Sequence, residues 1–431
     1  MKTAIAELRG RRVWDSRGRP TVEVEIRTTG DAVGRAIAPA GASTGSGEAV
    51  DLRDGGSTFG GYDVRRALYG IATEIAPLLR GRDVRDQRAI DALLVTLDGT
   101  PDKSRLGANA LVATSMAVAH AAAAATGVPL WRHLAGDGPV GPLPLPEIQI
   151  FGGGAHAGGR LDVQDFMVIA VGAPDFATAL DWTAEVHRHA GRLMAEAGRL
   201  CGVADEGGWW PAFDRNEEAL EMLLRAIEAA GRLPGEEMAI ALDIAASTLG
   251  RCGRYHLRRE AEPRELDSDG LAALWLRWLE RYPIVSIEDP LAEDDPAAFA
   301  AFTRAAGPGV QVVADDLVVT DAARIRRAAA AGAGNTALIK PNQIGTLSEV
   351  REAVRAAGEA GWAGIVSARS GETEDVTIVH LAVGWGLPQL KVGSFARGER
   401  MAKWNEGLRL AEELPSGGAL PPAPRFPWGR G

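Results

Sequence analysis

This sequence of 431 residues has only two cysteines, no long apolar run and no excess of basic charge. The two cysteines, Cys201 and Cys252, are too few for a disulfide framework and lack the CxxC spacing of a metal site. No apolar run reaches the roughly 18 residues that a membrane span requires, and the first residues lack the apolar segment of a secretory signal. We therefore expect a cytoplasmic protein that does not bind a membrane.

The charge balance is acidic, with 57 acidic and 47 basic residues and a formal net charge of −10. This balance disfavours non-specific binding to nucleic acid, which depends on basic patches. Most of the excess acid is what a solvated surface carries, but some of it also fits carboxylates gathered around a metal ion. An apolar content of 46% and a charged content of 24% are typical of a globular protein.

The chain divides into a shorter N-terminal part and a longer C-terminal part. Residues 21–26 alternate between apolar and charged side chains, which predicts a half-buried strand, and residues 109–127 have helical character. A stretch rich in Pro and Gly, residues 136–147, is typical of a linker. The predicted units are an α+β domain at 1–135, a second domain at 140–415 and an irregular C-terminal tail at 416–431.

A repeating pattern follows the linker, in which short apolar runs end in a charged residue. These ends are Asp243, Glu288, Asp315, Lys340, the segment near Val366, and Lys391; from Glu288 onward they are about 25–27 residues apart. Each interval holds a stretch of helical character, so the pattern predicts successive βα units of an α/β fold. In a closed barrel the carboxyl ends of the strands converge on one face. We therefore expect these side chains to surround one site, although each of them alone would also suit a solvated turn.

Three carboxylates on adjacent strands, with no cysteine or histidine nearby, form an all-oxygen site of the kind that Mg²⁺ prefers. Lys340 comes next in strand order, and a nearby cation would lower the pKa of its ammonium group enough for it to act as a base. A carboxylate substrate chelated by Mg²⁺ has an acidified α-proton, and removal of that proton gives an enediolate that the metal stabilises. The sequence thus predicts proton abstraction next to a carboxylate.

Candidates for the opposing acid lie on two loops. Glu206 lies in "GVADEGGWWP", before the strand that carries Asp243. The segment "GGGAHAGGRLDVQDFM" offers His156, Gln164 and Asp165. A lone histidine is usually structural, but glycines flank His156 and suit a mobile or closely approaching loop, so we expect it to take part in catalysis.

The segment rich in Gly, Ser and Thr at residues 41–47, called the lid loop below, resembles a flexible lid. Ser43 within it would reach a metal ion. The polar loop after residue 366 holds Arg369 and Ser370, which suit an anionic group, and between them and the strand lies Ala368.

Along nearly its whole length the chain resembles the enolase family. The stretches that carry the resemblance are "DSRGRPTVEVE", "GASTGSGEA", "LGANA", "HAGG", "DEGG", "RYPIVSIEDPLAEDD", "VVADDL", "LIKPNQIGTLSE" and "SARSGETED". The resemblance implies an α/β fold with an enolase-type (β/α)8 barrel and an N-terminal α+β capping domain. It also implies a homodimer or higher homo-oligomer, two Mg²⁺ ions per active site and a small phosphorylated carboxylic acid as substrate.

The resemblance implies a role for most of the residues already singled out. These roles are metal ligand for Asp243, Glu288, Asp315 and Ser43, base for Lys340, acid for Glu206 with Gln164 and Asp165 in support, phosphoryl contact for Arg369 and Ser370, and carboxylate contact for Lys391.

Several positions depart from the family pattern. Ala368 stands where enolases have the histidine of "SHRSGETED", and Ala40 replaces the serine of the lid motif "PSGASTG". Asp165 is one methylene shorter than the usual glutamate. Trp209 and Trp210 replace small residues after "DEGG". The implied metal ligands, base and acid are unchanged, so the departures gather at the phosphoryl end of the site.

Three interpretations of the activity are open. The first is an ordinary enolase, a lyase that dehydrates 2-phosphoglycerate to phosphoenolpyruvate. The second, which we favour from the sequence, is an enzyme similar to carboxyphosphonoenolpyruvate synthase of phosphonate natural-product pathways. It would combine 2-phosphoglycerate or phosphoenolpyruvate with CMP-phosphonoformate, a nucleotide-linked second substrate. Ala368 would open the phosphoryl subsite, and Trp209 and Trp210 would stack a nucleobase or simply pack their own loop. The third is a non-catalytic, enolase-like binding or structural protein, which the complete set of charged residues disfavours.

Overall fold

The N-terminal part of the chain forms an antiparallel sheet that is covered by helices. The computed structural model describes residues 2–260 and 263–429. The sheet has the strand order β1 (Ile5–Trp14), β2 (Pro20–Thr28) and β3 (Val33–Ile37). The strand predicted at residues 21–26 lies within β2, where Val22, Val24 and Ile26 are buried. The helices of this part are α1 (Arg65–Gly70), α2 (Ala76–Leu79), α3 (Gln87–Asp98), α4 (Ala108–Thr126) and α5 (Leu130–Ala135).

Helix α4 is the core helix of the N-terminal part, and it corresponds to the helix predicted at residues 109–127. Among the described residues it is the one helix that is long and apolar enough to span a membrane by length and composition, yet 83% of its apolar window is buried inside the protein. Strand β3 crosses it very closely: a Cβ at Gly34 would lie 2.1 Å from the backbone nitrogen of Ala121. The apolar character of α4 is therefore explained by packing against the sheet.

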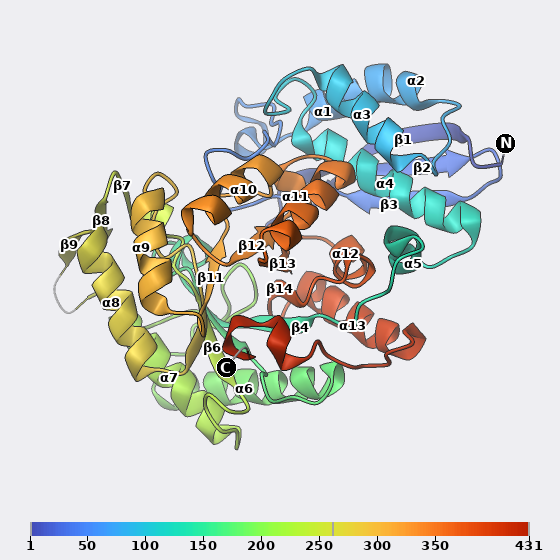
Figure 1. Cartoon of the computed structure of the whole chain (residues 1–431). Coiled ribbons are helices and arrows are strands. Elements are labelled where there is room, and N and C mark those ends of the chain that lie inside the picture. Colours follow the sequence, from blue (N-terminus) through green and yellow to red (C-terminus); the bar gives the residue numbers. More distant parts are fainter. Residues whose placement is uncertain (1, 261–262, 430–431) are drawn as a thin grey trace.

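The C-terminal part forms a closed eight-stranded barrel, surrounded by helices (Figure 1). The barrel strands, in their order around the barrel, are β10 (Ile284–Glu288), β11 (Gln311–Ala314), β12 (Thr336–Ile339), β13 (Ala363–Ser367), β14 (Gln389–Ser394), β4 (Leu145–Gly152), β5 (Asp165–Ile169) and β6 (Ala239–Asp243). The surrounding helices are α6 (Phe176–Glu196), α7 (Asn216–Ala229), α8 (Ser268–Arg281), α9 (Pro296–Ala306), α10 (Ala322–Ala331), α11 (Leu347–Glu359), α12 (Thr377–Trp385) and α13 (Gly398–Glu413). A small hairpin sheet of β7 (Gly250–Arg251), β8 (Arg254–Leu257) and β9 (Arg264–Asp267) lies beside α8 and α9 (Figure 1). The predicted α/β barrel with an N-terminal α+β domain is confirmed.

Three details of the barrel differ from the sequence prediction. Strand β5 runs antiparallel to both β4 and β6, because the segment between β4 and β5 holds only the short turn η3 (Gly154–Ala157) and no crossover helix. Strand β4 begins at Leu145, so the predicted linker ends inside the barrel. Lys391 is the third residue of β14 and not its end, because the strand continues to Ser394.

The two parts share an interface on one side of the barrel. Leu347 of α11 and Leu381 of α12 belong to the apolar core of the N-terminal part, which also contains α4. At the opposite end of the barrel from the predicted site, Phe426 packs against Leu145 and Ile169. The tail that we expected to be irregular therefore contributes Phe426 to the barrel core, with Trp428 packed against it. Residues 430–431 of that prediction lie outside the described residues.

Candidate active site

The carboxylates predicted from the repeating pattern lie together at one end of the barrel. Asp243 is the last residue of β6 and Glu288 the last of β10, and the two are direct partners in the parallel register. Asp165 opens the antiparallel strand β5 opposite Asp243. Asp315 follows β11 and Lys340 follows β12. Neighbouring strands with their ends in register thus bring residues far apart in the sequence to one rim.

Two lysines partner the carboxylates of this rim. Lys391 Nζ donates to Asp243 Oδ2 and to Glu288 Oε2, both at 2.8 Å. Lys340 Nζ donates to the carboxylate of Asp315, whose other oxygen accepts a hydrogen bond of 2.8 Å from Gln343 Nε2. All of these charged groups are buried or nearly so. Loss of one group would therefore leave its partner buried without a hydrogen bond, which is costly.

Burial and mutual repulsion shape the ionisation of the site. Burial, together with the nearby charge of Asp243, raises the pKa of Glu288 well above its usual value. Burial alone would lower the pKa of Lys391, but Asp243 and Glu288 outweigh it and the pKa is raised. Burial alone would also lower the pKa of Lys340, but the charge of Asp315 outweighs burial and the pKa is raised. The lowered pKa expected for Lys340 therefore requires a cation, since the protein groups alone raise it.

The donor set fits a hard divalent cation. Glu288 Oε1 is buried and has no hydrogen-bond partner in the protein, so one carboxylate oxygen is left free beside Asp243 and Asp315. All of the available ligand atoms are oxygens, the type that Mg²⁺ prefers. Asp289, the residue after Glu288, accepts the backbone N–H groups of Asp315 and Asp316, each at 2.9 Å. It thereby fixes the chain that presents the Asp315 carboxylate.

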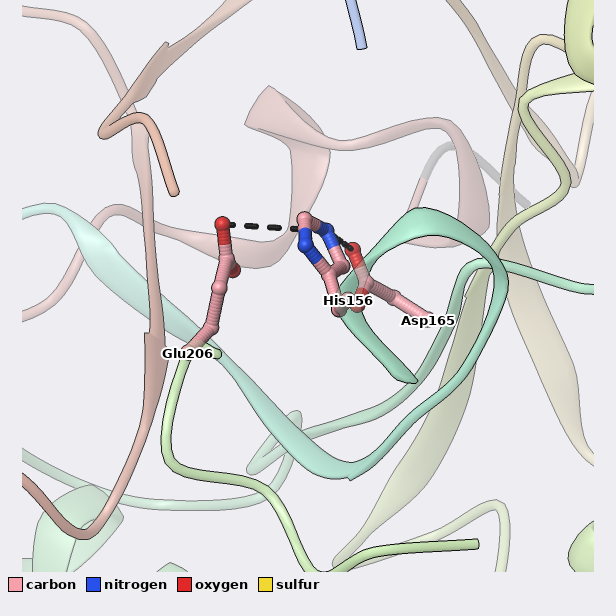
Figure 2. Close-up of side chains that lie close together, drawn as sticks. All are labelled: His156, Asp165 and Glu206. Carbon is pink, nitrogen blue, oxygen red and sulfur yellow. Dashed lines mark ion pairs between the residues drawn. The ribbon is translucent and has the colours of Figure 1, made fainter. Parts of the chain in front are cut away.

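His156, Asp165 and Glu206 form a second group at the same cavity (Figure 2). The His156 ring lies between the two carboxylates, with Nε2 3.7 Å from Asp165 Oδ2 and 3.7 Å from Glu206 Oε1. Burial raises the pKa of Asp165 to about 6. Burial acts in the same sense on Glu206, but His156 and Arg400 outweigh it and lower its pKa.

The opposite part of the cavity carries a buried arginine that is held by the lid loop. Arg369 donates to Asn342 Oδ1 at 3.0 Å, to the backbone carbonyl of Ser43 at 3.0 Å, and to both oxygens of Glu48. Ala40, the residue before the lid loop, exchanges two backbone hydrogen bonds with Gly371, at 2.9 and 2.8 Å. The lid loop is therefore attached to the segment that carries Arg369.

Two polar side-chain atoms of residues that line the cavity lack partners. Ser370 Oγ and Gln164 Oε1 are buried and make no hydrogen bond within the protein. Ala368 also lines the cavity and contributes only a methyl group. The cavity thus offers a guanidinium and a free hydroxyl for an anionic group, with no imidazole beside them.

Nearly all of the residues singled out in the sequence converge on this site. The lining residues include Ser43, His156, Gln164, Asp165, Glu206, Asp243, Lys340, Ala368, Arg369, Ser370 and Lys391. Glu288 and Asp315 join them through the lysines. Trp209 and Trp210 do not line the cavity. Trp209 packs against α6, where its ring stacks on His187, as in the packed-loop alternative that the sequence left open.

Sequence reasoning missed several residues that support the site. Gln149 of β4 donates to Asp165, and Glu48 and Asn342 partner Arg369. Arg400 of α13 donates to the backbone carbonyls of Arg369 and Ser370. The sequence held a signal for Gln149, since the polar residues Glu147 and Gln149 stand at alternate positions of an apolar strand, a spacing that places both on the same face. It held none for Glu48, Asn342 or Arg400.

Comparison with known proteins agrees with this geometry. Residues 5–134 match the family model described as "Enolase, N-terminal domain", and residues 141–421 match "Enolase, C-terminal TIM barrel domain". The chain is 46% identical over 418 residues to Enolase 1 of Desulfitobacterium hafniense (strain Y51), an overlap that covers 97% of this chain and 95% of that protein. This likeness contradicts the interpretation as a carboxyphosphonoenolpyruvate synthase, and it favours the ordinary-enolase alternative.

Proposed function

The chain belongs to the enolase family, and from that premise we propose that it is a Mg²⁺-dependent lyase that dehydrates 2-phosphoglycerate to phosphoenolpyruvate. The observation that carries the proposal is the shared cavity of Lys340 and Glu206 beside buried carboxylates. Lys340 follows β12, whereas the loop of Glu206 is bonded to β14 and β4 on another arc of the barrel. A base and an acid thus approach one substrate from different directions.

The proposed chemistry has two proton transfers. Lys340 Nζ takes the proton from C2 of the substrate, and the electron pair moves into the adjacent carboxylate. The C3–oxygen bond then breaks, and the proton with which the hydroxyl leaves as water comes from the carboxyl group of Glu206. Glu206 must take up this proton before the step, because His156 and Arg400 lower its pKa. Asp243, Glu288 and Asp315 would hold Mg²⁺, which stabilises the negative charge that develops on the substrate carboxylate. Ser43 would reach the second ion.

The remaining polar groups would fix the orientation of the substrate. Arg369 and Ser370 would hold the phosphoryl group, because a guanidinium and a free hydroxyl suit its oxygens. Lys391 would contact the carboxylate. His156, held between Asp165 and Glu206, would orient the acid. Gln164 donates to Asp243 at 3.1 Å and leaves its own oxygen free toward the cavity.

The direct test is incubation of the protein with Mg²⁺ and 2-phosphoglycerate, while the ultraviolet absorbance of phosphoenolpyruvate is followed. We expect turnover that requires both components and stops on chelation of the metal. Lack of turnover by folded protein at saturating Mg²⁺ would remove the proposal. Turnover would also set aside the non-catalytic interpretation.

Magnesium is expected to stabilise the folded protein even without substrate. A ligand that binds only the folded state stabilises it by RT ln(1 + [L]/Kd), which is about 2.7 kcal/mol at a hundredfold excess over Kd. Thermal unfolding with and without millimolar Mg²⁺ measures this effect, and Glu288→Gln should reduce it. An unchanged melting temperature in the wild-type protein would argue against a cation on these carboxylates.

Introduction of an imidazole next to Arg369 is expected to improve phosphoryl binding. Ala368→His should raise kcat/KM for 2-phosphoglycerate by about tenfold, since one hydrogen bond to a charged group contributes roughly 1.5–3 kcal/mol. Ala368→Leu is the matched control, because it adds bulk without a donor and should not raise kcat/KM. Equal effects of the two substitutions would show that space, and not the donor, limits binding.

We also propose a homodimer or higher homo-oligomer and a cytoplasmic location. Trp14 and Phe59 support the first part, because they form an exposed edge-to-face pair, with 51% and 44% of their surfaces accessible. Analytical ultracentrifugation of the whole chain tests the oligomeric state. The domain limits predicted at 1–135, 140–415 and 416–431 are likewise proposals, which limited proteolysis would test.

A further inference from the structure

Trp209 lies three residues after Glu206, yet its side chain is absent from the lining of the cavity and packs on helix α6. Its ring stacks on His187, with 4.7 Å between the ring centroids and 21° between the planes. Its Nε1 donates to the backbone carbonyl of His187 at 2.8 Å. Both the face and the polar edge of the indole are therefore engaged by a single turn of α6.

Helix α6 has a gap at Gly191 that receives this indole. A Cβ at Gly191 would lie 2.4 Å from Cζ2 and 2.7 Å from Cε2 of Trp209, closer than real Cβ contacts. A glycine inside a helix costs about 1 kcal/mol relative to alanine. Because Gly191 lies well inside α6, between Phe176 and Glu196, the helix carries this cost at the point where the indole needs space.

The same contacts hold the loop that carries Glu206. The His187 ring lies against this loop through its stack on Trp209, three residues after Glu206. Burial holds the pKa of His187 at about 4, so the ring is neutral and its stacking does not change across the neutral pH range. On the barrel side, the backbone N–H of Trp209 donates to the backbone carbonyl of Ile150 at 2.8 Å, and the backbone N–H of Ser394 donates to the backbone carbonyl of Glu206 at 2.9 Å. The loop is thus held between the barrel and α6.

We propose that His187, Gly191 and Trp209 form a clamp on α6 that sets the position of the Glu206 carboxylate and thereby the rate at which the hydroxyl group leaves. Trp209 and His187 are positioning residues in this scheme, since neither touches the cavity. The proposal rests on the dehydration of 2-phosphoglycerate proposed above. The clamp should affect the second proton transfer of that reaction and not the first, because it positions Glu206 and leaves Lys340 in place.

The experiment that distinguishes the two proton transfers compares two rates in the magnesium-loaded enzyme. One is the exchange of the C2 proton of 2-phosphoglycerate with deuterated water, which reports on Lys340. The other is the formation of phosphoenolpyruvate, which also needs Glu206. Trp209→Val should lower dehydration by about ten- to a hundredfold, the range for a displacement of roughly 1 Å, while exchange changes by less than about threefold. The ratio of exchange to dehydration therefore rises.

Trp210→Val is the matched control. Trp210 is the neighbouring tryptophan, is only half-buried, and has no side-chain hydrogen bond or ring contact among the described residues. Its replacement should leave the ratio unchanged. An unchanged ratio in Trp209→Val, or an equal fall of both rates, would overturn the clamp, whereas absence of turnover in the wild type would instead overturn the proposed function.

Gly191→Ala tests the clamp without removing any of its atoms. The added methyl group should displace the indole and raise the exchange-to-dehydration ratio, although alanine favours the helix. In the double variant Trp209→Val/Gly191→Ala, the methyl group has space, so Gly191→Ala should add no further change in the ratio. Such non-additivity is expected for residues in contact. Additive effects of the two substitutions, or an unaltered ratio in Gly191→Ala, would contradict the proposal.

Discussion

Replacement of Lys340 by alanine is expected to lower both C2-proton exchange and dehydration by about 10⁴-fold, the upper end of the range for loss of a general base. Lys340 is the cavity lysine that partners only Asp315, whereas Lys391 is held by both Asp243 and Glu288. Apart from Lys391, no other lysine is among the residues that line the cavity, so no second amine can replace Lys340 as the base. Both rates should fall together, because exchange and dehydration share the first proton transfer.

The fold of the Lys340→Ala variant should remain, since Gln343 still donates to Asp315 at 2.8 Å. Lys103→Met is a suitable control, because it removes another buried lysine, paired with Glu349 at 2.9 Å outside the cavity. Deuterium exchange followed by NMR and phosphoenolpyruvate absorbance measure the two rates. Exchange that survives in Lys340→Ala would assign the base to a different group.

The arrangement of the barrel rim was accessible from the sequence because it follows from chain length. A buried strand, a helix and two turns consume about 25 residues, so charges that recur at that interval fall at equivalent strand ends. Asp243 lies outside this interval, because the hairpin sheet of β7 to β9 is inserted between its strand and that of Glu288. Glu288, Asp315 and Lys340 follow the rule. Lys391 does not follow the rule, because its strand continues for three more residues. Its side chain nevertheless lines the shared cavity.

The direction in which loop side chains point could not be predicted from the sequence in the same way. Trp209 and Trp210 are adjacent and equally aromatic, and the sequence alone gave no reason to place either one outside the cavity. The decisive partner of Trp209 is Gly191, which lies elsewhere in the chain and reads as an ordinary helix glycine until the two are seen in contact. The antiparallel direction of β5 was hidden for a related reason, since it depends on how the loop after β4 returns to the barrel.

The synthase-like reaction favoured from the sequence was wrong because unusual residues were assumed to lie together. The departures at Ala368, Trp209 and Trp210 were treated as one rebuilt subsite because they are all unusual. In the structure, Ala368 lines the cavity while the tryptophans do not, so the three changes have no common location. Without the stacking surface, the alterations that remain near Arg369 are the imidazole lost at Ala368 and the hydroxyl lost at Ala40, and the overall likeness to Enolase 1 outweighs them.

Glu206→Gln is expected to lower dehydration by about 10³-fold while C2-proton exchange is retained within about fivefold. Glutamine keeps the size of the side chain but has no acidic proton to give to the departing hydroxyl. Lys340 lies on another arc of the barrel and can still remove and return the C2 proton. The rise in the exchange-to-dehydration ratio should exceed that of Trp209→Val, because the substitution removes the acid itself, whereas loss of the clamp only displaces it.

Asp205→Asn provides the control for this substitution, since it alters the neighbouring carboxylate. Asp205 pairs with Arg17 at 3.2 Å, and its side chain is 36% exposed, so the pair contributes at most about 1 kcal/mol. Both rates should therefore stay within about threefold of the wild type. If Glu206→Gln abolished exchange together with dehydration, Glu206 would be needed for proton abstraction itself. The division of labour between Lys340 and Glu206, on which the clamp also depends, would then be incorrect.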